Sequence, residues 1–329
     1  MRALRPPPRR RRLRLSVLLR NSLSWLLPAA SLLLAGACAT SRSAPSSSAA
    51  FDAAVAQASR RCACRIGVSA RHLESGRTYE RDGDSEFESA SVIKIGILTE
   101  AMARVGAGEI DLSDRWTLTA ESKASGSGTL LILDPGLNPT WNDLLTLMIG
   151  PSDNTATNAW IDRLGIDRIN ARMNGIGLTH YRLFAKLPAL TRSGENPTPW
   201  KGFRLGIVTP NEAARWMTRV AQGELLDSAT SRRIFAYLDK DPTRLRIARR
   251  FPSEYLWAGK SGSMHGVRND SGILRTKKGR FVLAILTDRS ESENPSAADH
   301  PSVLAIADVA RAIVETWMRD LPDIVQKPE

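Results

Sequence analysis

Apolar and polar residues repeat along this chain with two different periods, and the two periods occupy different regions. Helical spacing of apolar positions predicts helices over residues 51–60, 92–105, 141–149, 154–164, 168–173, 211–222, 227–238 and 301–318. Strand patterns occur at both ends, over residues 64–70, 78–80, 255–261, 272–276 and 281–287. The first two strands form a hairpin, which is too small to be stable alone, so the strands of both ends should share one sheet. The pattern predicts an α/β domain that is interrupted by an all-α one.

The first fifty residues have a different pattern. Eight arginines within the first twenty residues precede an apolar stretch over 23–34 and three small residues. This order is typical of a secretory signal peptide, which we assign to residues 1–37. The alternative is an uncleaved membrane anchor, but the stretch is shorter than the ~20 residues that span a bilayer and contains Pro28. We expect a Ser/Ala-rich tether over 38–50 and a folded domain over 51–320, in which 51–90 and 230–320 form the α/β part and 91–229 the helical part.

The signal segment ends in the sequence LAGAC over residues 34–38, which resembles a bacterial lipobox. We therefore expect a lipid anchor on Cys38 and a mature protein attached to a membrane in the bacterial periplasm or cell envelope. Ala35 stands where such motifs usually have leucine, and ordinary cleavage after Ala37 or Ala39 is the alternative. The pair Arg11-Arg12 also permits a twin-arginine export route.

Charge and composition bear on whether the chain binds nucleic acid or a metal. The formal net charge is +12, but eight positive charges belong to the signal segment, and aromatic residues make up only 6%. The basic surface with interleaved aromatic rings that nucleic-acid binding requires is therefore not expected. The chain has no C-x-x-C motif and its four histidines are scattered, so we expect no zinc site.

Cys62 and Cys64 remain if Cys38 carries lipid. Their i, i+2 spacing places them on one face of a predicted strand, in an oxidising compartment. The Cα separation in an extended strand is close to the ~6.8 Å limit for disulfides. A strained bridge and two free thiols are both compatible with this spacing.

Three short motifs contain side chains that support nucleophilic chemistry. Ser91 and Lys94 begin an apolar helix, where a three-residue spacing puts both on one face and burial can lower the pKa of the amine that accepts the serine proton. The sequence SDN follows at 152–154, at the start of another helix, and KSG at 260–262, at the end of a strand. Taken singly, each is as well explained by a helix cap or a surface lysine.

In this order the three motifs resemble those of the penicillin-binding protein and class A β-lactamase superfamily, with KSG in place of KTG. GSGT at 126–129, DPGL at 134–137 and SDNTATN at 152–158 resemble its class A β-lactamase-like branch. The resemblance covers about residues 51–318. It implies a β-lactamase/transpeptidase-like fold, in which an antiparallel sheet is flanked by helices and carries an inserted all-α subdomain, and a monomer without a cofactor.

The resemblance also implies a role for each motif residue. Ser91 would be the acylated nucleophile, Lys94 its proton acceptor and Ser152 the proton shuttle to the leaving nitrogen. Asn154 would hold the substrate side chain, and Lys260, Ser261 and Gly262 would bind the substrate, whose carboxylate would lie on Lys260 and Ser261. The backbone N–H groups of Ser91 and Ser263 would form the oxyanion hole.

One position departs from the family pattern. A loop glutamate of an E-P-x-L-N run activates the deacylating water in the β-lactamases, whereas this chain has LPALT at 187–191. Leu187 cannot accept a proton, so rapid deacylation by that route is not expected. Glu195 is a substitute base if its loop folds over Ser91, and otherwise a solvated carboxylate.

Two polar clusters near the KSG motif have alternative interpretations. His265, Arg268 and Asp270 either contact substrate or belong to a polar hairpin turn. The basic residues Arg244, Arg246, Arg249 and Arg250 are interpreted as a solvated face.

Three functions follow from the motif set, in order of preference. The first is hydrolysis of a small-molecule β-lactam, which because of Leu187 is slow or uses an unusual deacylation step. The second is cleavage of a cell-wall D-Ala-D-Ala peptide or of an ester at the same site. The third is a penicillin-binding protein that is acylated once and does not turn over.

Overall fold

The computed structural model describes residues 47–188, 202–240, 244–291 and 298–324, all of which belong to one structural unit, Pro45–Glu329. The expected signal peptide, Cys38 and Glu195 lie outside the described residues. Over the described ranges, none of the helices combines the length and the apolar character that crossing a bilayer requires.

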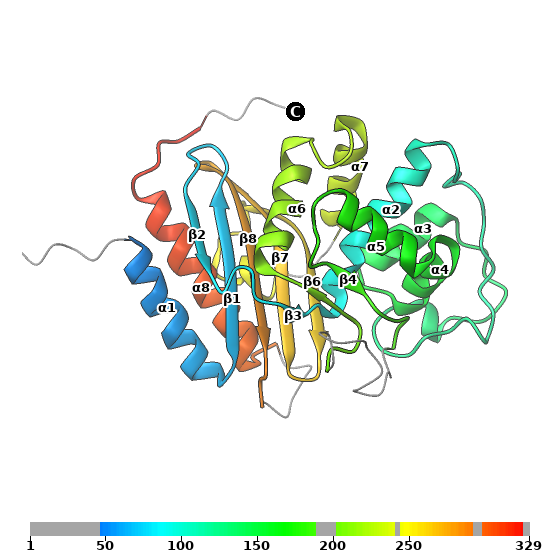
Figure 1. The fold of residues 1–329 in the computed structure, drawn as a ribbon, viewed down its shortest axis with the longest axis horizontal. Coiled ribbons are helices and arrows are strands. Elements are labelled where there is room, and N and C mark those ends of the chain that lie inside the picture. The colour runs from blue at the N-terminus through cyan, green and yellow to red at the C-terminus, as the bar shows by residue number, and fades with distance from the viewer. Residues whose placement is uncertain (1–46, 189–201, 241–243, 292–297, 325–329) are drawn as a thin grey trace, which may run out of the picture. The chain divides into compact units, whose positions relative to one another are not determined.

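The centre of the unit is a five-stranded antiparallel sheet with the order β2-β1-β8-β7-β6 (Figure 1). Its strands are β1 (Arg65–His72), β2 (Thr78–Arg81), β6 (Leu256–Met264), β7 (Val267–Thr276) and β8 (Gly279–Asp288). Because β1 pairs with β8, the N-terminal hairpin and the C-terminal strands share one sheet, as the pattern of apolar residues predicted. The expected antiparallel α/β fold is confirmed.

Helices cover both faces of this sheet. On one face, α1 (Ser47–Cys62) and α8 (Pro301–Met318) pack together, and on the other α6 (Pro210–Gln222) packs against β1, β7 and β8. Strand β8 is apolar at successive positions because its side chains alternate between two cores. Phe281, Leu283 and Ile285 join the core under α1 and α8, and Val282, Ala284 and Leu286 join the other core.

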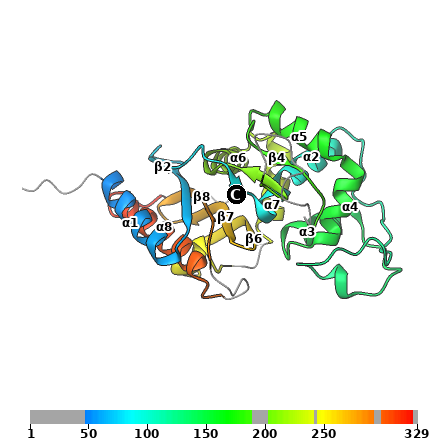
Figure 2. The same cartoon turned by 60° about the horizontal axis from the view of Figure 1, so that its bottom comes forward.

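The helical part is built around α2 (Lys94–Gly106), as Figure 2 shows from a second direction. Helix α2 is surrounded by α3 (Trp141–Ile149), α4 (Asn154–Leu164), α5 (Ile166–Gly175) and α7 (Ser228–Leu238). Every residue of α2 from Lys94 to Met102 is buried, which explains why its sequence is apolar around most of its circumference. Helix α6 lies within the segment 91–229, so that segment supplies a helix to the sheet as well as to the helical part.

A second, three-stranded sheet was not predicted. It has the order β3-β5-β4, with β3 (Phe87–Glu88), β4 (Arg182–Leu183) and β5 (Gly206–Val208). Strands of two or three residues are too short to show an alternating pattern. This sheet matters for the site because β3 ends three residues before Ser91.

Cys62 and Cys64 form a disulfide, and their expected position on one strand is wrong. Cys62 ends α1, and Cys64 lies between Ala63, which has a positive φ of 45°, and the first residue of β1. This turn brings the two Cα atoms to 5.1 Å, whereas an extended chain would hold them farther apart.

Candidate active site

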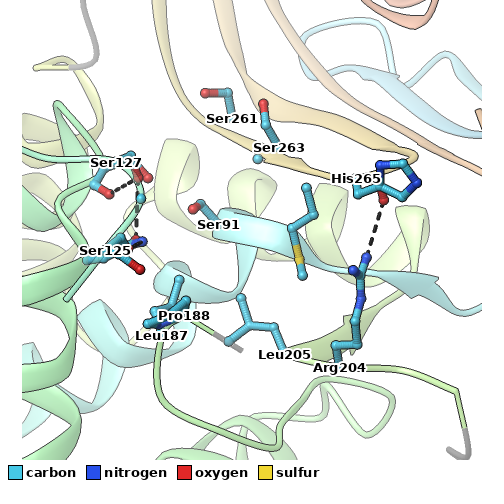
Figure 3. Close-up of a pocket in the computed structure, with 15 residues that line it drawn as sticks. Ser91, Ser125, Ser127, Leu187, Pro188, Arg204, Leu205, Ser261, Ser263 and His265 are labelled. Carbon is cyan, nitrogen blue, oxygen red and sulfur yellow. Dashed lines mark hydrogen bonds between the residues drawn. The ribbon is translucent and has the colours of Figure 1, made fainter. Parts of the chain in front are cut away.

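A cavity of about 370 Å³ lies between β6 and the helical part, and Ser91 lines it. Figure 3 shows Ser91 near the middle, Ser125 and Ser127 at one end, and Arg204 and His265 at the other. Ser261 and Ser263 border it on the side of β6, whereas Leu187, Pro188 and Leu205 make the opposite side apolar. No aspartate or glutamate is among the described residues that line it.

Ser91 belongs to a short 3-10 helix (Ala90–Ile93) that leads into α2, and only 8% of its surface is exposed. The preceding Ala90 has a φ of 43°, a conformation that a residue with a Cβ rarely adopts. Strand β6 passes close to this turn: a Cβ on Gly262 would lie 2.8 Å from the backbone nitrogen of Ser91. The two expected oxyanion-hole segments, Ser91 and Gly262-Ser263, are therefore in direct contact.

Lys94 is fully buried and points to the SDN motif. Its Nζ donates to the carbonyl oxygen of Ser152 at 2.6 Å, to Ser152 Oγ at 3.1 Å and to Asn154 Oδ1 at 3.1 Å. Burial lowers the pKa of Lys94 well below its ordinary value, the positive charge of Lys260 lowers it further, and Asp153 acts in the opposite direction. A lowered pKa favours the neutral amine, which is the form that accepts a proton.

The SDN motif is held by its aspartate. Asp153 caps α4 by accepting from the backbone N–H of Ala156, and its second oxygen accepts from Thr129 and Leu130. Ser152 has a positive φ of 60°, and Ser152 and Asn154 both line the cavity. The helix-cap interpretation of this motif therefore applies to Asp153, while Ser152 and Asn154 are available to the cavity.

Strand β6 places the KSG motif along the same cavity. Ser261, Gly262 and Ser263 line it, whereas Lys260 is fully buried, with its amine donating to the carbonyl of Ser261 at 3.1 Å. Lys260 is close enough to Lys94 to influence its pKa.

Arg246, which was interpreted from the sequence as part of a solvated face, instead contacts strands β6 and β7. Arg246 donates to the carbonyl oxygens of Gly262 and Asn269, and at 2.6 Å to Ser263 Oγ. Arg244 binds the carbonyl oxygens of Tyr255 and Pro252, and Arg249 and Arg250 bind Asp299 and Asp308. For Arg244 and Arg246 the interpretation was wrong, because backbone acceptors leave no charge signature in a sequence, whereas Arg250 is exposed as expected.

The three polar residues that follow the KSG motif lie in different places relative to the cavity. His265 lies at the turn between β6 and β7 and lines the cavity, and its carbonyl oxygen accepts from Arg204 at 3.2 Å. Arg268 and Asp270 are buried within β7, so they are not part of a polar turn, and neither lines the cavity. Burial and the charge of Arg246 lower the pKa of Arg268 to about 10.

Leu187 lines the cavity, and Asn158 holds its backbone from both sides. Asn158 Nδ2 donates to the carbonyl of Leu187 at 2.5 Å, and Leu187 N donates to Asn158 Oδ1 at 2.9 Å. The described cavity wall therefore has an apolar side chain at the position discussed for the deacylating base.

Comparison with known proteins gives consistent results. The model of the beta-lactamase enzyme family matches residues 49–317. Beta-lactamase SME-1 of Serratia marcescens is 24% identical over 257 residues, which cover 76% of this chain and 83% of that protein. A beta-lactamase structure from Sphaerobacter thermophilus has 32% identity and a TM-score of 0.73, covering 83% of this chain and 99% of that one.

The structure of PBP-A is similar as well, with 26% identity, a TM-score of 0.71, and coverage of 82% of this chain and 96% of that one. A variant of PBP-A in which one leucine is replaced by glutamate is solved as an acyl-enzyme complex with penicillin G. It has 26% identity, a TM-score of 0.69, and coverage of 82% and 97%.

Proposed function

This chain belongs to the beta-lactamase enzyme family and is a serine β-lactamase-like hydrolase, and we propose that it opens β-lactam rings through an ester on Ser91 that is hydrolysed slowly. The observation that carries the proposal is the combination of a buried Lys94 bonded to Ser152 and Asn154 with an apolar Leu187 across the cavity. The first set of residues supports acylation. The second removes a base for deacylation.

Acylation proceeds by proton transfer through Lys94. Ser91 Oγ attacks the lactam carbonyl carbon, and its proton passes to the neutral amine of Lys94. The carbon–nitrogen bond breaks, and the nitrogen takes a proton from Ser152 Oγ, which Lys94 resupplies across their 3.1 Å hydrogen bond. The backbone N–H groups of Ser91 and Ser263 stabilise the negative charge that develops on the carbonyl oxygen. The products are an ester on Ser91 and an open ring.

Deacylation needs a water molecule and a group that accepts its proton. Leu187 cannot accept one, and the described cavity lining contains no carboxylate. The similar PBP-A variant with a glutamate in place of a leucine was captured with penicillin G as an acyl-enzyme, which supports β-lactams as the class of ligand. Because the described lining of the cavity offers no carboxylate as a base for water, we expect the acyl-enzyme of this protein to accumulate.

Rapid mixing with a chromogenic cephalosporin tests this proposal. A burst of about one equivalent of product, followed by slow turnover, is expected, because ester formation outpaces hydrolysis. Ser91→Ala should remove the burst, while Ser125→Ala, which changes a cavity-lining serine with no assigned step, should retain it. Turnover without a burst would contradict slow deacylation. A burst with no subsequent turnover would indicate a penicillin-binding protein.

We propose that the mature protein is lipidated on Cys38 and faces the periplasm, on the strength of the sequence over residues 1–38. Fractionation of cells that express the wild-type protein and a Cys38→Ala variant tests this location. Wild type should sediment with membranes and the variant should not. Equal membrane association of the two proteins would contradict the anchor.

A further inference from the structure

Strand β7 carries a buried amide next to the turn that leads to Ser91. The side chain of Asn269 is fully buried, and its Nδ2 donates to the carbonyl oxygens of Glu88 at 2.8 Å and Ser89 at 3.1 Å. Its Oδ1 accepts from the backbone N–H of Thr287 at 3.0 Å. Both hydrogens and the oxygen of this amide are therefore used, and two of its three bonds hold the peptide groups that precede the nucleophile.

The pairing of β6 and β7 explains how Asn269 reaches this turn. Asn269 is paired with Gly262, and the side chains of paired residues lie on the same face of a sheet. A Cβ on Gly262 would lie 3.1 Å from the carbonyl oxygen of Ser89, the atom that Asn269 also binds. The glycine leaves room for the turn, and the asparagine beside it supplies donors.

The backbone of Asn269 is connected to the second half of the expected oxyanion hole. Its carbonyl oxygen accepts from Arg246, whose guanidinium also donates to the carbonyl of Gly262 and to Ser263 Oγ. The side chain of Asn269 thus contacts the segment before Ser91. Its backbone carbonyl is linked through Arg246 to the segment at Ser263.

We infer that Asn269 is a positioning residue that fixes the distance between the backbone N–H groups of Ser91 and Ser263. The turn needs such support because Ala90 has a positive φ, which persists only where the surrounding contacts hold it. The inference rests on the proposed function in one respect, namely that Ser91 forms a tetrahedral adduct whose oxyanion lies between these two N–H groups.

The test compares Asn269→Asp with Asn170→Asp. An aspartate at 269 retains the acceptor for Thr287 but replaces the donor with a carboxylate oxygen that faces two carbonyls. Asn170 serves as the control, because its amide also donates to a backbone carbonyl and accepts from a backbone N–H, both of Leu183, at 2.9 and 2.8 Å, and it does not line the cavity. The first measurement is the affinity for phenylboronic acid, which forms a tetrahedral adduct with an active-site serine whether or not β-lactams are substrates.

The second measurement is the rate of acylation by a penicillin as a function of its concentration. For Asn269→Asp we expect boronate affinity to fall at least tenfold. The maximal acylation rate should fall by a similar factor, with the half-saturating concentration changed less than threefold, because small displacements of reacting groups affect the chemical step more than binding. Asn170→Asp should match wild type in both. If Asn269→Asp does not fold, Asn269→Ser retains one hydroxyl donor and should show an intermediate loss.

The outcomes separate the two proposals. Folded Asn269→Asp protein with wild-type boronate affinity and acylation rate would overturn the positioning role, as would equal losses in Asn170→Asp. Wild-type protein that does not bind the boronate would also overturn it, because Ser91 would then lack a competent oxyanion hole. Boronate binding that Asn269→Asp weakens, without any penicillin adduct on wild type, would support the positioning role and contradict the proposed function.

Discussion

At neutral pH a lysine amine is ordinarily protonated and cannot take a proton from a serine. Burial of Lys94 lowers its pKa, and two neighbouring charges act in opposite directions, with Lys260 lowering the pKa and Asp153 raising it. If neutral Lys94 is the base, acylation is active above this pKa and is lost as the pH falls through it. The position of this acidic limit is therefore set by identified residues.

Two substitutions should move this limit in opposite directions. Lys260→Met removes a positive charge, raises the pKa of Lys94 and should shift the loss of acylation to higher pH. Asp153→Asn removes a negative charge, lowers the pKa and should shift the loss to lower pH. The pH dependence of the second-order acylation rate constant with a penicillin measures both. Shifts in the same direction, or a limit that neither substitution moves, would show that Lys94 is not the group that titrates.

A single substitution at Leu187 should supply the base that is missing for deacylation. Asn158 binds both the N–H and the carbonyl oxygen of residue 187, so the backbone should stay in place in Leu187→Glu. The new carboxylate would then enter the cavity and could activate water. We expect the lifetime of the acyl-enzyme to shorten by at least tenfold, with acylation changed little. The decay of labelled protein after removal of excess penicillin gives this lifetime. Leu187→Gln is the isosteric control and should leave the lifetime long.

Individual residues were predictable from the sequence where a motif fixes both type and spacing. Ser91, Ser152 and Asn154 line the cavity, and Lys94 contacts the SDN motif. Arg246 and Asn269 were not found, because their partners are mainly backbone carbonyls brought close only by strand pairing. Arg268 was left open between a substrate contact and a polar turn, because its burial within β7 cannot be read from a polar run.

Strand β6 packs directly against the turn that carries the nucleophile Ser91. At Gly262 an added Cβ would meet Ser91 N at 2.8 Å, Ala90 Cβ at 3.0 Å and the carbonyl of Ser89 at 3.1 Å. Two of these are backbone atoms and cannot rotate away as the end of a side chain would. Strand β6 or the turn must therefore move to accept a larger residue.

Gly262→Ala should lower the maximal acylation rate by tenfold or more, because moving β6 separates the two oxyanion donors. Gly175, the last residue of α5, has no atom within 4 Å of its added Cβ and no positive φ, so Gly175→Ala should acylate like wild type. The rate of adduct formation measures both variants. An unchanged rate in folded Gly262→Ala would show that β6 does not help to stabilise the oxyanion.

Long elements were predicted better than short ones. The bounds of α3, α4 and α8 agree with the helical spacing of apolar residues, which extends over several turns in each. Strands β6 and β7 are longer than predicted, because polar residues around the turn at His265 and Gly266 interrupt the apolar pattern while pairing continues. The turn at Ala63, which brings Cys62 and Cys64 together, also has no sequence signal, because alanine rarely adopts a positive φ.

At the scale of the whole molecule, the site depends on segments far apart in the sequence. Ser91 and Lys94 come from the first third, the SDN motif from the middle, and the KSG motif from the last strands. The sheet brings β1 and β8 together, and β6 at its edge meets the helix that carries the nucleophile. The antiparallel sheet is therefore necessary to bring the three motifs to one site.

In the proposed reaction, Ser91 forms an ester with a β-lactam faster than the ester is hydrolysed. Intact-mass spectrometry of purified protein during incubation with a penicillin tests it directly, since ring opening adds the whole mass of the antibiotic. We expect one adduct per chain that forms early, persists after excess penicillin is removed, and is absent from Ser91→Ala. Wild-type protein without an adduct, or an equal adduct on Ser91→Ala, would contradict it.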